Sequence, residues 1–186
     1  MEHFYEKIHP DWFDYQDIYT DMVNKASDGA HFVELGSHRG RSAAYMAVEI
    51  VNSGKKIKFD TVDNFSVDYG NPDNFAINGS TKEIFDANIE PVKDYVNLIV
   101  GLTVEVAQNY ADESLDFVWV DADHHYDSVL ADINTWYPKV KKGSWIGGHD
   151  YSGSDTSINR IVKELFPSHT EVAGRLTSSW MYMKPL

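Results

Sequence analysis

The feature that most constrains the fold is the regular alternation of short apolar runs with segments of helical spacing. Runs that suit strands cover residues 31–36, 56–63, 96–101, 115–121 and 145–148, and helical patterns follow at 42–51, 81–89, 103–110, 126–140 and 157–166. A first helix is expected over about 12–26, and two short strands near 170–172 and 180–183. Strands that are apolar throughout and alternate with helices are typical of a parallel sheet covered on both faces. We therefore predict a doubly wound α/β fold with a mostly parallel sheet.

The chain has the length of a single domain, and no repeat, low-complexity tract or linker divides its 186 residues. Residues 1–29 are expected to form an N-terminal helical segment. Residues 64–80 interrupt the alternation with turn-forming residues, and a loop of this length in a compact domain usually has a function. We expect an active-site loop here, with Tyr69 and Phe75 closing over bound reactants.

The charge balance narrows the possible partners. Asp and Glu number 29 against 16 Lys and Arg, for a net charge of -13, so attraction to nucleic acid or to an anionic membrane surface is not expected. No apolar run reaches the length of a membrane-spanning helix. The N-terminus is charged and aromatic, unlike a secretory signal, and the chain has no cysteine. We expect a cytoplasmic protein that acts on a small molecule.

In parallel sheets, ligands bind at the carboxyl ends of the strands, so the residues that end each strand are the site candidates. The first strand ends in a turn with glycines at Gly36 and Gly40, within the segment Glu34–Ser42. The dinucleotide pattern G-x-G-x-x-G is absent because no glycine lies between them. The turn suits a ligand with an amino-acid head and no phosphate, or it is an ordinary strand-to-helix turn.

The second strand ends at Asp63. In the doubly wound arrangement a carboxylate at this position accepts hydrogen bonds from a ribose diol, and the nearby Phe65 is placed to lie against an adenine ring. The alternative is that Asp63 only begins the turn before Asn64.

The fourth and fifth strands end in dense groups of ionisable residues. Asp121, Asp123, His124 and His125 follow one of them, and His149 and Asp150 follow the other. Because the ends of neighbouring parallel strands lie side by side, Asp121, His149 and Asp150 are expected to converge on a site for Mg²⁺, Mn²⁺ or Fe²⁺. The alternative is a set of satisfied hydrogen-bonding groups beside a polar pocket.

Together these stretches resemble the class I S-adenosylmethionine-dependent methyltransferases. Residues 34–40, with the pattern E-x-G-x-x-x-G, are similar to the first motif of that family, and Asp63 matches its ribose-binding acid. Residues 120–132 and 142–151 are similar to the subgroup of macrocin-type sugar O-methyltransferases and cephalosporin hydroxylase relatives. The resemblance covers roughly residues 30–151.

The resemblance implies a Rossmann-like, seven-stranded sheet with a reversed last strand near 180–183. It implies that Asp121 and Asp150 are the first and last metal ligands and that His124 is the general base. It also implies that S-adenosylmethionine is held by a set of cofactor-binding residues: Glu34, Gly36, Ser37, Gly40, Ser42, Asp63, Asn64, Phe65 and Asp121. One position departs from the pattern, because His149 replaces the more usual acid and shifts the metal preference away from a purely oxygen-ligated Mg²⁺ site.

The predicted function is methyl transfer from S-adenosylmethionine to a hydroxyl oxygen of a small molecule, assisted by Mg²⁺ or Mn²⁺. Two alternatives stand beside it: a non-catalytic cofactor-binding module of the same fold, and a nicotinamide-dependent oxidoreductase, which the missing middle glycine disfavours. Sugars, catechol-like phenols and amino-acid-derived hydroxyls are all open as substrates. Aromatic residues at Trp12, Phe13, Trp136 and Trp180 are expected to be exposed and to favour a homodimer.

Overall fold

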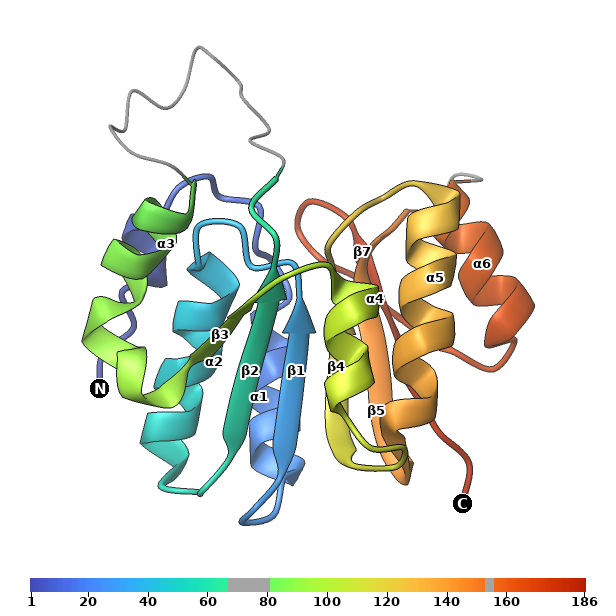
Figure 1. Cartoon of the computed structure of the whole chain (residues 1–186), viewed down its shortest axis with the longest axis horizontal. Coiled ribbons are helices and arrows are strands. Elements are labelled where there is room, and N and C mark those ends of the chain that lie inside the picture. Colours follow the sequence, from blue (N-terminus) through green and yellow to red (C-terminus); the bar gives the residue numbers. More distant parts are fainter. Residues whose placement is uncertain (67–80, 153–155) are drawn as a thin grey trace.

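The computed structural model describes residues 1–66, 81–152 and 156–186, and it contains a seven-stranded sheet in the order β3-β2-β1-β4-β5-β7-β6 (Figure 1). The strands are β1 His31–Leu35, β2 Lys58–Asp63, β3 Asn97–Val100, β4 Leu115–Val120, β5 Val140–Tyr151, β6 Thr170–Val172 and β7 Ser178–Met183. The helices are α1 Gln16–Lys25, α2 Arg41–Ser53, α3 Thr81–Ile89, α4 Thr103–Val106, α5 Tyr126–Trp136 and α6 Ser157–Leu165. Short 3-10 turns cover Tyr5–Lys7, Glu90–Tyr95, Ala107–Asn109 and Tyr137–Lys139.

Strand direction confirms the predicted fold. Strands β1 to β5 pair in parallel, while β7 pairs antiparallel with β5 and with β6. The carboxyl ends of the parallel strands therefore meet at one edge of the sheet, the upper edge in Figure 1. The chain order reverses between β1 and β4, which is the position where open α/β sheets bind ligands.

The sheet separates two hydrophobic cores, and alternate residues of one strand enter opposite cores. Phe32 of β1 packs with α1 and α2 on one face, whereas Val33 packs with α5 and α6 on the other. Both side chains are almost fully buried, at 2% and 1% exposure. Burial on both faces explains why the parallel strands read as continuous apolar runs in the sequence.

Two of the expected element boundaries that are wrong affect the site. The first helix begins at Gln16 rather than near Trp12, because Tyr15 leaves the helical conformation at φ -113° and ψ 35°. The fifth strand extends over Val140–Tyr151 and not only over 145–148, so His149 and Asp150 lie inside its end rather than after it.

The expectation of four exposed aromatic residues is also wrong. Phe13, Trp136 and Trp180 are core residues at 3%, 0% and 1% exposure, and only Trp12 of the four is exposed, at 49%. The exposed-aromatic argument for a homodimer therefore fails. Among the described residues, no helix has both the length and the apolar character that crossing a membrane requires. Of the expected active-site loop 64–80, residues 67–80, with Tyr69 and Phe75, lie outside the described residues.

Candidate functional site

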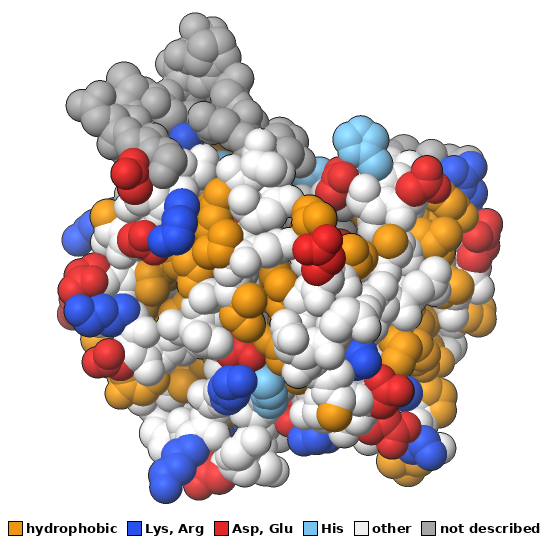
Figure 2. All heavy atoms as spheres, viewed as in Figure 1, with side chains coloured by type: hydrophobic (Ala, Val, Ile, Leu, Met, Phe, Trp, Pro, Cys, Tyr) orange, Lys and Arg blue, Asp and Glu red, His pale blue; other side chains and the backbone are white. Residues whose placement is uncertain are grey.

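A cavity of about 1060 Å³ lies at the carboxyl ends of the parallel strands, and it takes in most of the expected site residues. Figure 2 shows acidic and histidine side chains gathered at this upper rim of the molecule. The expected residues that line the cavity are Gly36, Ser37, Ser42, Asp63, Asn64, Phe65, Asp121, His124, His149 and Asp150. Two residues expected to bind cofactor, Glu34 and Gly40, are not among the lining residues.

Gly36 allows the ends of β1 and β4 to meet. Its φ is +88°, and a Cβ at this position would lie 2.2 Å from the carbonyl oxygen of Asp121. Both facts exclude a side chain, because L residues disfavour this backbone region and the neighbouring carbonyl fills the space. Gly36 therefore lets the turn after β1 lie directly against Asp121, the first residue after β4.

Asp63 holds the turn that follows β1. Its Oδ2 accepts hydrogen bonds from the backbone N–H groups of Ser37 and His38, both at 2.8 Å, and its Oδ1 accepts one from Phe65 N–H at 2.7 Å. A carboxylate has about four acceptor positions, so the described residues leave one acceptor position of Oδ1 unused. Asp63 therefore begins its turn and also lines the cavity.

The residues around Asp63 have features that suit a ligand. Ser37 is 3% exposed and lines the cavity, yet its Oγ finds no hydrogen-bond partner among the described residues. Phe65 lines the cavity with its backbone at φ +51°, an uncommon conformation for a bulky residue. Asn64 is exposed, and its Oδ1 accepts from Ser66 N–H at 2.9 Å.

Glu34 and Gly40 make their contacts with residues of the fold rather than with the cavity. Glu34 is fully buried and accepts hydrogen bonds at 2.8 Å from the hydroxyl groups of Tyr19 and Thr61. Burial raises the pKa of Glu34 to about 7, although hydrogen bonds from Ser42, Thr61 and Tyr19 oppose this shift. Gly40 precedes α2 with φ +82°, and a Cβ there would lie 3.0 Å from side-chain atoms of α3.

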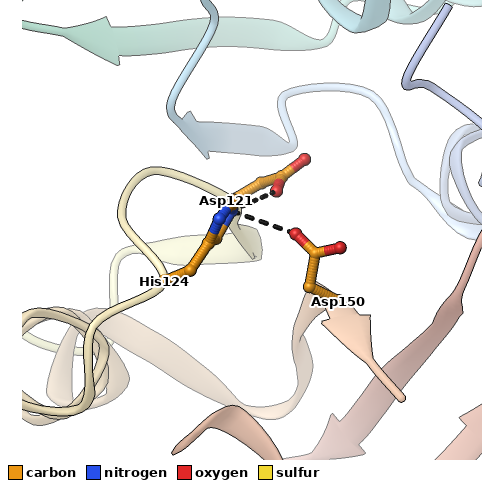
Figure 3. A group of neighbouring side chains, drawn as sticks. All are labelled: Asp121, His124 and Asp150. Carbon is orange, nitrogen blue, oxygen red and sulfur yellow. Dashed lines mark ion pairs between the residues drawn. The ribbon is translucent and has the colours of Figure 1, made fainter. Parts of the chain in front are cut away.

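Three side chains from the ends of β4 and β5 form an acid–histidine cluster: Asp121, His124 and Asp150 (Figure 3). One possible ligand atom from each lies within 4.8 Å of the other two. His124 Nε2 is 3.0 Å from Asp150 Oδ2 and 3.8 Å from Asp121 Oδ1, so the ring bridges the two carboxylates.

The two carboxylates change the protonation state of His124. The neighbouring carboxylates of Asp121 and Asp150 raise the pKa of His124 to about 10, and partial burial opposes this only in part. At neutral pH the ring is therefore protonated when no other cation occupies the cluster. A protonated imidazole cannot accept a proton, so any base role requires its separation from the carboxylates.

A bulge in β5 directs Asp150 into the cavity. The pairing of β5 with β7 shifts register between Gly148 and Tyr151, and Asp150 has φ +55°. This backbone conformation costs about 1–3 kcal/mol in a non-glycine residue, and such strain tends to persist at functional sites. Bulges of this kind re-aim a side chain, which here turns the carboxylate toward β4.

His149 approaches the same cluster from its other side, and it brings in residues that the sequence did not indicate. Its Nδ1 is 3.8 Å from Asp121 Oδ1 and 3.7 Å from Asp150 Oδ1, and its Nε2 is 2.7 Å from Asp14 Oδ1. Tyr15 donates its hydroxyl hydrogen to Asp121 Oδ2 at 2.8 Å. The only sequence signal for Asp14 is a single acid inside the aromatic run Trp12–Tyr15.

Asp132 of α5 also lines the cavity without having been expected there as a site residue. It is 2% exposed and accepts a hydrogen bond from Thr103 Oγ1 of α4. Burial raises the pKa of Asp132 to about 6, opposed by the Thr103 hydrogen bond. Asp132 is therefore a buried acid with a raised pKa that lines the same cavity as Asp63.

A viral protein is similar in sequence to most of this chain. The uncharacterized protein R132 from Acanthamoeba polyphaga mimivirus is 27% identical over an alignment of 146 residues, and the alignment covers 74% of this chain. The chain spans 62% of the length of that relative.

Solved structures share the fold at low identity. NovP, an O-methyltransferase, matches with a TM-score of 0.67 at 16% identity, over 92% of this chain and 79% of its own. Cofactor-bound Rv0187 from MTB matches with a TM-score of 0.65 at 16% identity, over 95% of this chain and 84% of its own. A SAM-dependent O-methyltransferase from Thermotoga maritima matches with a TM-score of 0.62 at 9% identity, over 92% of this chain and 64% of its own.

The family model described as a methyltransferase domain matches residues 33–151, which include the β1 turn, Asp63 and the whole acid–histidine cluster. The chain therefore belongs to the methyltransferase domain family and has the fold of the class I S-adenosylmethionine-dependent methyltransferases.

Proposed function

We propose that the chain transfers a methyl group from S-adenosylmethionine to a hydroxyl oxygen of a small molecule, with Mg²⁺ or Mn²⁺ assisting. One observation carries the proposal: the same cavity is lined by the β1 turn with Asp63 and by the acid–histidine cluster. Two proteins that share the fold are O-methyltransferases by name, which supports the hydroxyl as acceptor.

The residues of the β1 turn fit the cofactor. Among the described residues, Asp63 has one acceptor position left for a ribose hydroxyl and Ser37 Oγ lacks a partner, and Phe65 lines the same cavity. A cavity of about 1060 Å³ has room for the cofactor and an acceptor. Bound S-adenosylmethionine would supply an electrophilic methyl group on a sulfonium.

The acid–histidine cluster fits a divalent cation. Asp121 and Asp150 of this cluster provide carboxylates, and His149, which lies beside the cluster with Nδ1 at 3.8 and 3.7 Å from their Oδ1 atoms, adds an imidazole. Together they form a mixed oxygen and nitrogen donor set of the kind that Mn²⁺ or Fe²⁺ accepts and that Mg²⁺ tolerates. A bound cation would polarise a substrate hydroxyl and lower its pKa.

A cation bound to these carboxylates would take the place of the His124 ring between them. With its Nε2 no longer bridging Asp121 and Asp150, His124 would lose the two carboxylates that raise its pKa and could accept the proton of a substrate hydroxyl. The chain's main contribution to the rate would then be to hold the acceptor oxygen in line with the methyl group.

Calorimetry tests the proposal directly. Titrations of S-adenosylmethionine and S-adenosylhomocysteine, with and without Mn²⁺ or Mg²⁺, should give micromolar binding of both. Methyl transfer to a panel of sugars, phenols and amino-acid-derived hydroxyls should follow. Absence of cofactor binding under every metal condition would overturn the proposal.

A further inference from the structure

We infer that Asp14 and Tyr15 are positioning residues that orient His149 and Asp121 for cation binding, an inference that rests on the proposed function. The two residues are consecutive and end the segment before α1, so one short stretch of backbone reaches both strand ends. Asp14 has a side-chain exposure of 2%, and Tyr15 is 5% exposed. Asp14 pairs with a ring nitrogen of His149, and Tyr15 donates a hydrogen bond to Asp121.

Asp14 determines which ring nitrogen of His149 carries hydrogen. Its Oδ1 is 2.7 Å from His149 Nε2, and its Oδ2 accepts backbone hydrogen bonds from Leu176 and Thr177. A carboxylate can only accept, so the hydrogen must be on Nε2. In the neutral ring, a hydrogen on Nε2 leaves the Nδ1 lone pair facing the oxygens of Asp121 and Asp150, at 3.8 and 3.7 Å.

This arrangement has the form of a carboxylate–histidine pair behind a metal site. Histidine ligands usually donate their second ring N–H to a carboxylate, which fixes the tautomer and the ring orientation. His149 is 7% exposed and its ring centroid lies 4.9 Å from that of Tyr15, so packing leaves the ring little room to turn.

Tyr15 fixes the second ligand. Its hydroxyl donates to Asp121 Oδ2, which turns Oδ1 toward His149 and His124. The Tyr15 ring is held in turn by Trp119 of β4, with centroids 4.6 Å apart. The segment before α1 therefore holds one ligand on β4 and one on β5.

The variant Asp14→Asn gives a sharp test. The backbone N–H groups of Leu176 and Thr177 still need an acceptor, so the single amide oxygen of the substituted side chain should stay with them. The amide NH₂ would then face His149 Nε2 and force the other tautomer, with hydrogen on Nδ1 and pointing at the two carboxylates.

Two measurements on the full chain separate the possibilities. Long-range ¹⁵N–¹H NMR at alkaline pH reports the His149 tautomer without any metal, and electron paramagnetic resonance reports Mn²⁺ binding. We expect the Nε2–H tautomer in the wild type and the Nδ1–H tautomer in Asp14→Asn. We expect Asp14→Asn and Tyr15→Phe to weaken Mn²⁺ binding by about 10- to 100-fold. S-adenosylhomocysteine affinity should be unchanged in Asp14→Asn.

Tyr19→Phe is the matched control. Tyr19 is also a buried tyrosine whose hydroxyl donates to a carboxylate at 2.8 Å, but its partner Glu34 lies outside the acid–histidine cluster. Its Mn²⁺ affinity should equal that of the wild type.

The outcomes distinguish this inference from the proposed function. An Nδ1–H tautomer in the wild type, or wild-type Mn²⁺ affinity in both Asp14→Asn and Tyr15→Phe, would overturn the inference. A tautomer change in Asp14→Asn in a chain that binds no Mn²⁺ would support the positioning of His149 and overturn the metal part of the proposed function.

Discussion

At the scale of single residues, the charge of His124 is the property of the site most open to measurement. Its pKa is raised from 6.5 to about 10 by Asp121 and Asp150. A group with a raised folded-state pKa stabilises the fold fully below its unfolded pKa, and this contribution is lost as pH rises through the folded value. In metal-free protein, the stability advantage of the wild type over His124→Asn should therefore be largest below about pH 6.5 and should vanish near pH 10.

Urea denaturation in the presence of a chelator, repeated along a pH series, measures this difference. Because the His124 side chain is 49% exposed, solvent screens part of the interaction, and the shape of the pH profile is more informative than its size. A difference that stays constant between pH 6 and 10 would show that His124 does not bridge the carboxylates.

Replacing Asp63 should test its role in cofactor binding. In Asp63→Asn one acceptor oxygen becomes a donor, and the site loses a charge-assisted hydrogen bond worth about 1.5–3 kcal/mol. We expect S-adenosylhomocysteine to bind about 10- to 100-fold more weakly, as measured by calorimetry. Asp116→Asn is the control, because Asp116 also accepts a backbone N–H, from His31 at 2.8 Å, but does not line the cavity. Equal weakening in both variants would contradict a specific role for Asp63.

At the scale of elements, the junction of β1 and β4 depends on Gly36. Gly36→Ala introduces a Cβ at φ +88° and 2.2 Å from the Asp121 carbonyl oxygen, so we expect a loss of about 2–5 kcal/mol from backbone strain and overpacking. Gly54, after α2, has φ +67° with nothing within 4 Å of the added Cβ. Gly54→Ala should therefore cost only about 1 kcal/mol. Similar unfolding free energies for the two variants would show that the β1–β4 contact tolerates a side chain.

The elements also show what the sequence can and cannot predict. Strand ends such as Asp63 and Asp121 were predictable, because a parallel sheet brings the carboxyl ends of neighbouring strands together. The place of the segment Trp12–Tyr15 in the site is not predictable from the sequence, because the spacing of its aromatic residues also fits a helix. The partners of Asp14 are 135 and 162 positions away along the chain, at His149 and Leu176. No local pattern indicates contacts of that separation.

At the scale of the whole molecule, the site connects parts of the chain that are far apart in sequence. Asp14 before α1, Asp121 after β4, His149 on β5 and Thr177 before β7 are joined by direct contacts or by residues that they share. The predicted fold contained the strands but not this connection, because it arises only when the N-terminal segment packs across the sheet. A ligand bound at this point stabilises several elements at once.

Ligand binding should accordingly raise the unfolding temperature of the entire chain in one transition. A ligand at 100 times its dissociation constant stabilises the folded state by about 2.7 kcal/mol. For a chain of this size, each 1 kcal/mol corresponds to about 2–4 °C, so S-adenosylhomocysteine or Mn²⁺ alone should raise Tm by about 5–11 °C. Because Gly36 of the β1 turn lies directly against Asp121 of the acid–histidine cluster, the two sites are close enough to couple, and the shift with both ligands present should differ from the sum of the two single shifts. Differential scanning calorimetry measures this, with Ca²⁺ and adenosine as comparison ligands. A shift with S-adenosylhomocysteine and none with Mn²⁺ would leave methyl transfer in place and remove the cation from it.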